Sequence, residues 1–72
     1  MALSQKHQRL GRTIRKLREE HNLTLEELAH EADIDTSFLG YIERGERNIT
    51  TEKLFRVAKA LKVKISDLFE SL

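Results

Sequence analysis

Residues 24–45, TLEELAHEADIDTSFLGYIERG, are the stretch of this chain that decides its fold. Thr24 is suited to cap a helix, and Glu27 three residues later completes a capping box. Apolar residues then recur at i, i+3, i+4 and i+7, which marks one buried helical stripe: Leu25, Leu28, Ala29 and Ala32. Asp35 is suited to cap a second helix, which should end at about position 44, before Gly45 in a left-handed position. The stretch therefore predicts two short helices joined by a tight turn.

The second of these helices has two different faces. Leu39 and Ile42 lie three residues apart and can hold it against the first helix. The other side carries small and polar residues at helical spacing: Ser37, Gly40, Tyr41 and Arg44. Such a face packs poorly but suits the major groove of DNA, where short polar groups meet base edges and Arg grips guanine or phosphate. An ordinary solvated helix face is the alternative, and the spacing alone does not choose between the two.

The composition predicts a single all-α domain over residues 1–72, a compact bundle of five short helices. The chain has 72 residues, no Pro, no Cys and three Gly. A chain this short buries only about 60% of its unfolded surface, so a dimer would add to a marginal core. It has no apolar run of membrane-spanning length and no secretory leader pattern. We therefore expect a soluble, cytoplasmic protein with no membrane partner.

The segments outside the central stretch supply three further predicted helices. The first is amphipathic up to about Glu20, with Gly11 as a mild weakness that costs about 1 kcal/mol against Ala. A fourth follows a Thr50 cap, and a short last one follows Ser66. The basic residues of the fourth helix are expected to form a solvated face, namely Lys53, Arg56, Lys59 and Lys62.

The charge is small in total but unevenly distributed. The formal net charge is only +1. Residues 1–18 hold six Lys or Arg and no acid, whereas residues 19–35 hold seven acids and neither Lys nor Arg. One basic side can steer a polyanion whatever the total charge. The alternative is that these are merely solvated helix charges.

No constellation of catalytic or metal-binding residues is recognisable. The three His residues are scattered, and no Cys accompanies them. There is no Gly-rich phosphate loop, nucleophile elbow or acid/base pair. We therefore expect no cofactor, no metal and no enzyme activity.

A set of spaced residues resembles the XRE family, the phage repressor/Cro-like helix-turn-helix DNA-binding proteins. The residues that carry the resemblance are Arg18, Leu23-Thr24, Leu28-Ala29, Ile34 and Ile42-Glu43-Arg44-Gly45. The match covers about residues 8 to 70. It implies a lambda-repressor-like domain in which Arg18 and Glu43 form an ion pair that ties the first helix to the third. This pair would be structural and would not read DNA.

The resemblance also implies roles at the DNA. The residues expected at base edges are Thr36, Ser37, Tyr41 and Arg44. Those expected at the DNA backbone are Arg15, Phe38, Arg47, Asn48 and Lys53. Two alternatives stay open, because Arg44 near the helix end can reach either a guanine or a phosphate, and Phe38 can pack either on sugars or in the core.

Two positions depart from the family pattern. The family usually has Gln where this chain has Leu25, so one backbone contact is lost or replaced. It usually has Gly in the turn where this chain has Asp33, which tolerates the left-handed conformation but adds negative charge. Acids at 33 and 35 would weaken non-specific affinity, so an isolated subunit should bind DNA poorly and a dimer on a two-part site should bind well.

The end of the chain bears on assembly. Leu68, Phe69 and Leu72 are more apolar surface than a one-turn helix easily buries, and the family often dimerises at this end. The alternative is that Leu68 and Phe69 close the core and that Leu72 frays. The resemblance implies a homodimeric transcription regulator on double-stranded operator DNA, with RNA polymerase as a further candidate partner. The Asn48-Ile49-Thr50 run resembles the controller proteins of restriction–modification systems; the alternative is an antitoxin-like protein-interaction module.

Overall fold

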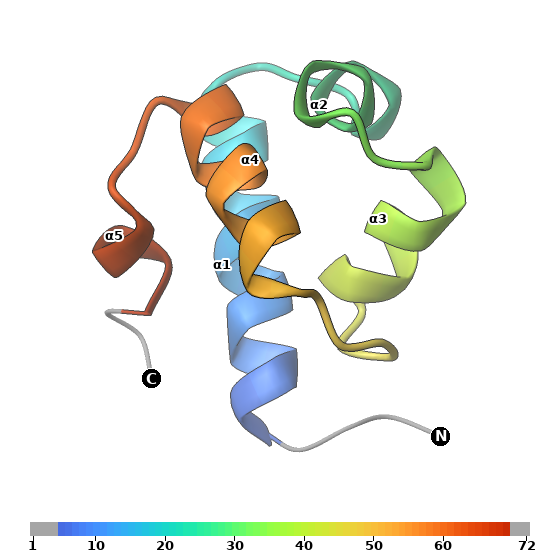
Figure 1. Cartoon of the computed structure of the whole chain (residues 1–72), viewed down its shortest axis with the longest axis vertical. Helices are drawn as coiled ribbons and strands as arrows, with labels where there is room; N and C mark the ends of the chain where they lie inside the picture. Colours follow the sequence, from blue (N-terminus) through green and yellow to red (C-terminus); the bar gives the residue numbers. More distant parts are fainter. Residues whose placement is uncertain (1–4, 70–72) are drawn as a thin grey trace.

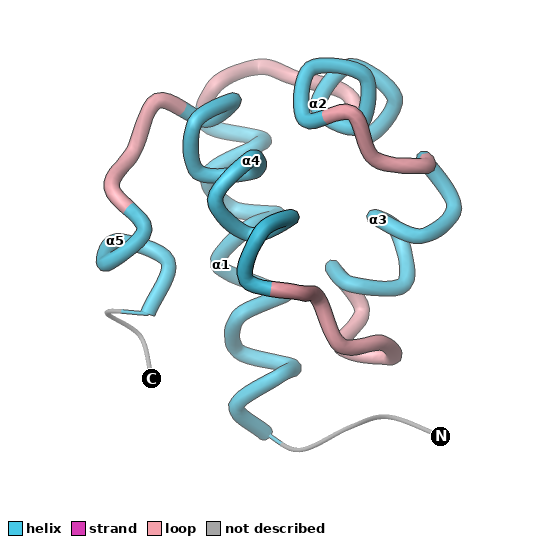
Figure 2. The backbone as a smooth tube through the Cα atoms, viewed as in Figure 1, coloured by secondary structure: helices cyan, strands magenta, loops and turns pink. Residues whose placement is uncertain are grey.

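Five helices and their connecting turns make up residues 5–69, the part of the chain that the computed structural model describes (Figure 1). The helices are α1 (Gln5–Glu20), α2 (Leu25–Ala32), α3 (Thr36–Glu43), α4 (Thr51–Leu61) and α5 (Ile65–Phe69). Figure 2 shows helix and loop but no strand in these residues. The predicted all-α fold of five short helices is confirmed. None of the helices within residues 5–69 is long and apolar enough to cross a membrane.

The helix boundaries follow from local capping groups. The Thr24 side chain accepts a hydrogen bond from the Glu27 N–H at 3.1 Å, and the Thr24 N–H donates to Glu27 Oε1 at 2.8 Å. Asp35 accepts from the Phe38 N–H, and Thr50 caps α4 in the same way. The predicted capping box and both predicted caps are therefore confirmed, and so is the end of α3 before Gly45, whose φ is +72°.

The predicted start of the last helix is wrong by two residues, because Ser66 was expected to cap it and Asp67 to be its first residue. α5 begins at Ile65, so Ser66 lies inside it and does not cap it. The bond at this end runs from the Lys64 N–H to Asp67 Oδ2, at 3.0 Å. The carboxylate of the third helical residue therefore fixes the entry to α5.

One core holds the five helices together. α1 packs against α3 and α5, while α2 packs against α3 and α4, so α3 is supported by two helices (Figure 1). The largest fully buried side chains come from all five helices: Ile14, Leu28, Leu39, Val57, Leu61 and Leu68. The support from α1 and α2 leaves one side of α3 at the surface.

The burial of Leu68 corrects part of the expected dimer surface. Its side chain is completely buried within the monomer, because α5 folds back onto α1 and α4. It therefore closes the core, so the alternative, in which Leu68 and Phe69 both close it, is right for Leu68. Phe69 remains 42% exposed, and Leu72 lies outside the described residues.

Gly11 is a packing residue, and its interpretation as a mere weakness of α1 was wrong. It is buried where α1 crosses α3. A Cβ built on Gly11 would collide with the backbone oxygens of Ile42 and Glu43, the latter at 2.6 Å. Only glycine allows the two helices to approach this closely.

Candidate nucleic-acid interface

The side of α3 turned away from the core is uncovered. Leu39 and Ile42 anchor α3 in the core, with 0% and 2% of their surfaces exposed. Ser37, Tyr41 and Arg44 lie on the other side and are exposed. This is the arrangement on which a role in reading DNA depends, since a recognition helix must present short polar groups to base edges.

An ion pair fixes the end of α3 to α1. Arg18 Nε donates to Glu43 Oε2 at 2.7 Å, and Arg18 Nη2 donates to Glu43 Oε1 at 3.1 Å. The hydrogen bond to Glu43 raises the pKa of Arg18, although burial acts in the opposite direction. Arg18 Nη1 also donates to the Leu23 carbonyl at 2.8 Å. The Arg18 guanidinium thus links three parts of the chain: α1, the end of α3, and the loop that precedes α2. These bonds fix the orientation of α3 relative to α1.

A cluster of charged and aromatic side chains covers the C-terminal part of α3. The guanidinium carbons of Arg44 and Arg47 lie 5.1 and 5.3 Å from the centre of the Tyr41 ring. Arg44 Nε also donates to Glu46 Oε1 at 2.8 Å. Cations within about 6 Å of an aromatic ring are attracted to its face. The three predicted contact residues therefore form one surface, and Glu46, which sequence reasoning missed, is part of it.

The spacing of Gly40 with Ser37 and Tyr41 indicated an open position on this surface, but the structure shows it covered. It is buried, and a Cβ on Gly40 would lie 3.3 Å from Arg44 Nη1 and 3.4 Å from Leu25 Cδ2. The Arg44 side chain therefore lies back along α3 over the position that lacks a side chain. Helical spacing gave the side on which Gly40 lies but not the side chains that cover it.

The remaining predicted contact residues surround α3 at different depths. Phe38 is half-buried against the core, and Lys53 Nζ lies 4.4 Å from the centre of its ring. Phe38 thus packs at the edge of the core, as one of its two alternatives held, and its ring also contacts a cation on α4. Thr36 is half-buried, whereas Asn48 is exposed. Arg15 is exposed on α1 and pairs with Glu19 at 3.5 Å.

One residue expected on a solvated face of α4 is tied to the turn instead. Arg56 Nη1 lies 3.5 Å from Asp33 Oδ2, and Arg56 is half-buried. Its Nε is buried without a hydrogen-bond partner among the described residues. Asp33 adopts the left-handed conformation, with φ 54°. Arg56 therefore offsets part of the negative charge that Asp33 brings to the turn, while the Asp33 side chain stays 94% exposed.

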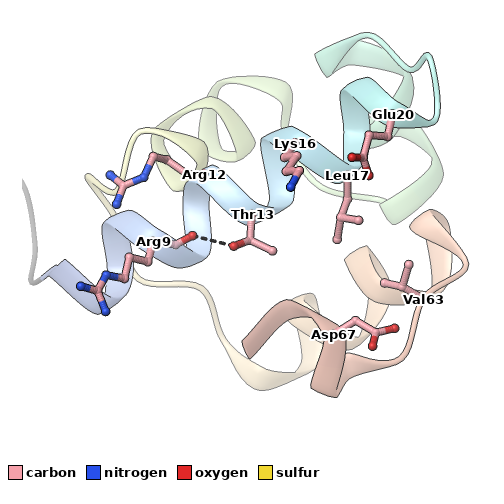
Figure 3. A pocket seen from close by; sticks show the side chains of 8 residues that line it. All are labelled: Arg9, Arg12, Thr13, Lys16, Leu17, Glu20, Val63 and Asp67. Carbon is pink, nitrogen blue, oxygen red and sulfur yellow. Dashed lines mark hydrogen bonds between the residues drawn. The ribbon is translucent and has the colours of Figure 1, made fainter. Parts of the chain in front are cut away.

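A second basic surface lies on a different side of α1. A groove of about 570 Å³ is lined by Arg9, Arg12, Thr13, Lys16, Leu17, Glu20, Val63 and Asp67. Figure 3 shows Leu17, Val63 and Asp67 pointing toward one another across it. Arg9 and Lys16 are two and five residues from Gly11, which on a helix of 3.6 residues per turn places them opposite the α3 contact. The basic residues of α1 thus divide between two surfaces.

No group of three or more His, Asp or Glu residues that could hold a metal ion occurs within residues 5–69. The geometry of the α3 surface combines hydroxyl groups, a phenol and guanidinium groups on a rigidly held helix. These groups suit the binding of a polyanion that also presents hydrogen-bond donors and acceptors, such as base edges.

Comparison with known protein families matches residues 14–68 to the helix-turn-helix family. Control protein C.BamHI of Bacillus amyloliquefaciens is 34% identical over 61 residues, which cover 83% of this chain and 75% of that protein. Control protein C.MunI of a Mycoplasma species is 32% identical over 65 residues, covering 89% and 88%.

A solved structure is similar over nearly the whole chain. The restriction-modification controller protein C.AhdI from Aeromonas hydrophila superposes with a TM-score of 0.90 at 32% sequence identity. The superposition covers 92% of this chain and 100% of that one. The likeness therefore extends well beyond the helix-turn-helix.

Proposed function

We propose a function from one premise, that this chain belongs to the XRE-type helix-turn-helix family, a family of DNA-binding transcription regulators. The chain acts as a homodimer that binds a two-part DNA operator and controls transcription. Its similarity to control proteins of restriction–modification systems supports a controller role of the same kind. The observation that carries the proposal is the exposed face of α3, with Ser37, Tyr41 and Arg44 at the surface.

In this proposal, α3 enters the major groove. Thr36, Ser37, Tyr41 and Arg44 meet base edges. The backbone of the DNA is held from several elements around α3 by Arg15, Phe38, Arg47, Asn48 and Lys53. The exposed positions of Arg47 and Asn48 directly after α3 support this division, because loops beside a recognition helix lie close to the phosphates.

Dimerisation is the second part of the proposal. A two-fold dimer presents two copies of α3, and its half-sites should lie ~34 Å apart, one turn of DNA. Phe69 is the described apolar residue at the end of α5 that remains exposed for such a contact. Two weakly bound half-sites held together give a strong site, which compensates for the acidic residues Asp33 and Asp35 near the turn.

Selection of bound sequences from random DNA tests this function directly. The expected result is a two-part site with two-fold symmetry, bound by a dimer at nanomolar concentration. If each dimer neutralises six to ten phosphates, affinity should fall roughly 10³- to 10⁵-fold between 50 and 200 mM salt. Failure to enrich any sequence would contradict the proposal. Recovery of a tightly bound partner protein in the same preparation would then support the antitoxin-like interaction module instead.

A further inference from the structure

The Arg44 side chain is held in place on three sides. Its Nε donates to Glu46 Oε1 at 2.8 Å, and its guanidinium carbon lies 5.1 Å from the centre of the Tyr41 ring. Its Nη1 lies over Gly40, 3.3 Å from the place that a Cβ would occupy. The guanidinium is thus directed along the exposed face of α3 and not away into solvent.

This placement determines which edge of the guanidinium is offered to a ligand. Glu46 takes the Nε side, and Nη1 and Nη2 lie along the α3 surface, 3.3 and 3.9 Å from the place that a Cβ on Gly40 would occupy. The N–H groups of these two nitrogens are therefore the ones that a ligand in front of α3 would meet. An arginine bonds to guanine O6 and N7 through two parallel N–H groups in a fixed fork. A free arginine loses much side-chain freedom when it forms this pair, whereas one already held loses less.

We propose that Glu46 and Gly40 are specificity-determining positioning residues, which hold Arg44 for two-bond recognition of one guanine in each half-site. This inference rests on the proposed function and extends it. Glu46 supplies the hydrogen bond that directs the guanidinium, and Gly40 supplies the space in which it lies. The Glu46 carboxylate also repels phosphate, so it weakens binding to all sequences while it sharpens the choice among them.

Two substitutions separate these roles with little risk to the fold. Glu46→Gln keeps the length of the side chain but removes its charge. Gly40→Ala adds a methyl group whose near neighbours are the flexible ends of Arg44 and Leu25, so the helix can form. Glu20→Gln is the matched control, because it removes the same charge from the groove on the other side of α1.

The experiment measures the dissociation constants of each protein for the operator selected by the wild type, for all its single-base variants and for random DNA. Arg44→Ala first identifies the base pair that Arg44 reads. At that base pair, Glu46→Gln and Gly40→Ala should each reduce discrimination roughly fivefold or more, since they loosen a bidentate contact. Glu46→Gln should also bind random DNA more tightly, and Glu20→Gln should keep the discrimination of the wild type.

Two results would overturn the inference while the proposed function stands. If Glu46→Gln strengthens binding to every sequence with discrimination intact, Glu46 is only a competing counter-ion. If Arg44→Ala weakens all sequences equally, Arg44 contacts phosphate and has no base to be positioned for. If the wild type itself shows no sequence preference, the proposed function fails and the inference fails with it.

Discussion

The backbone of Gly11 in α1 lies against the carbonyl oxygen of Glu43 in α3, so closely that a methyl group on Gly11 would stand 2.6 Å from that oxygen. Glu43 also pairs with Arg18, two helical turns after Gly11. A close backbone contact and an ion pair thus fix the same end of α3. The direction of the exposed face depends on both.

Gly11→Ala should destabilise the protein by about 1–3 kcal/mol, because the methyl group overpacks the helix crossing. Helix propensity alone predicts the opposite, a gain of about 1 kcal/mol. Urea unfolding followed by circular dichroism measures the difference. Lys16→Ala, at an exposed position of the same helix, is the control and should be nearly neutral. A stabilised Gly11→Ala protein would mean that α1 and α3 can move apart at little cost.

Arg18→Met should cost about 3–5 kcal/mol, since it leaves the Glu43 carboxylate buried without its partner. The two side chains are only 13% and 7% exposed, which makes the loss large. Arg15→Met breaks the exposed pair with Glu19 and should cost no more than about 1 kcal/mol. Thermal unfolding of both variants gives the comparison. Equal losses would show that the Arg18 pair is as well solvated as a surface pair.

The stability of the protein should depend on pH through the capping box of α2. The hydrogen bond from the Thr24 backbone lowers the pKa of Glu27 below its ordinary value of 4.5. The ionised carboxylate therefore stabilises the fold above that ordinary value, and this contribution is lost as the pH falls through the lowered pKa. Glu27→Gln should accordingly lose less stability than the wild type between neutral pH and about pH 3.

Thr24→Ala is the matched control for the capping box. It removes the hydroxyl but keeps the backbone N–H that donates to Glu27. Its stability should fall at neutral pH, by about 1 kcal/mol for a lost cap, while most of the pH dependence due to Glu27 is retained. Urea midpoints at several pH values distinguish the two variants. Parallel pH profiles for Glu27→Gln and the wild type would exclude this carboxylate as the source.

Lys62→Gly should stabilise the protein by about 0.5–1 kcal/mol. Lys62 ends α4 in the left-handed conformation, with φ 59°, which is strained for any residue with a Cβ. Glycine removes that strain, although it gives the unfolded chain more freedom. Lys59→Gly lies inside the same helix and should have the opposite effect, roughly 0.5–1 kcal/mol of destabilisation. Chemical denaturation of the two variants measures their free energies of unfolding. It tests whether the effect of a glycine depends on the backbone conformation at its position.

Much of the fold was predictable because its signals are local. Thr24 and Glu27 lie within one helical turn, and the Asp35 side chain accepts a hydrogen bond from the N–H three residues on. Both helix starts can therefore be predicted without knowledge of the rest of the chain. The last helix shows the limit of such signals. Ser66 is a good capping residue by type, but the Asp67 carboxylate bonds to the Lys64 N–H and moves the helix start to Ile65.

The features that sequence reasoning missed depend on contacts between distant residues. Within α1, nothing in the local sequence marks Gly11 as a packing residue. Its close contact is with the Glu43 backbone, which is distant in the sequence. Leu68 is at the end of the chain by number but at the centre of the core in space. The α3 surface was identified by helical spacing. The position of the Arg44 side chain over Gly40 depends on a side-chain conformation, which spacing does not specify.

The guanidinium groups of Arg44 and Arg47 lie close to the ring of Tyr41, so spectroscopy of this one tyrosine reports on the exposed face of α3. The chain has a single tyrosine and no tryptophan, so all of its tyrosine fluorescence comes from Tyr41. A fluorotyrosine substituted during expression would give one fluorine resonance at the centre of the face. Occupation of the surface by DNA, and any rearrangement of the two arginines, can therefore be followed in the unlabelled or minimally labelled protein without a reporter attached elsewhere.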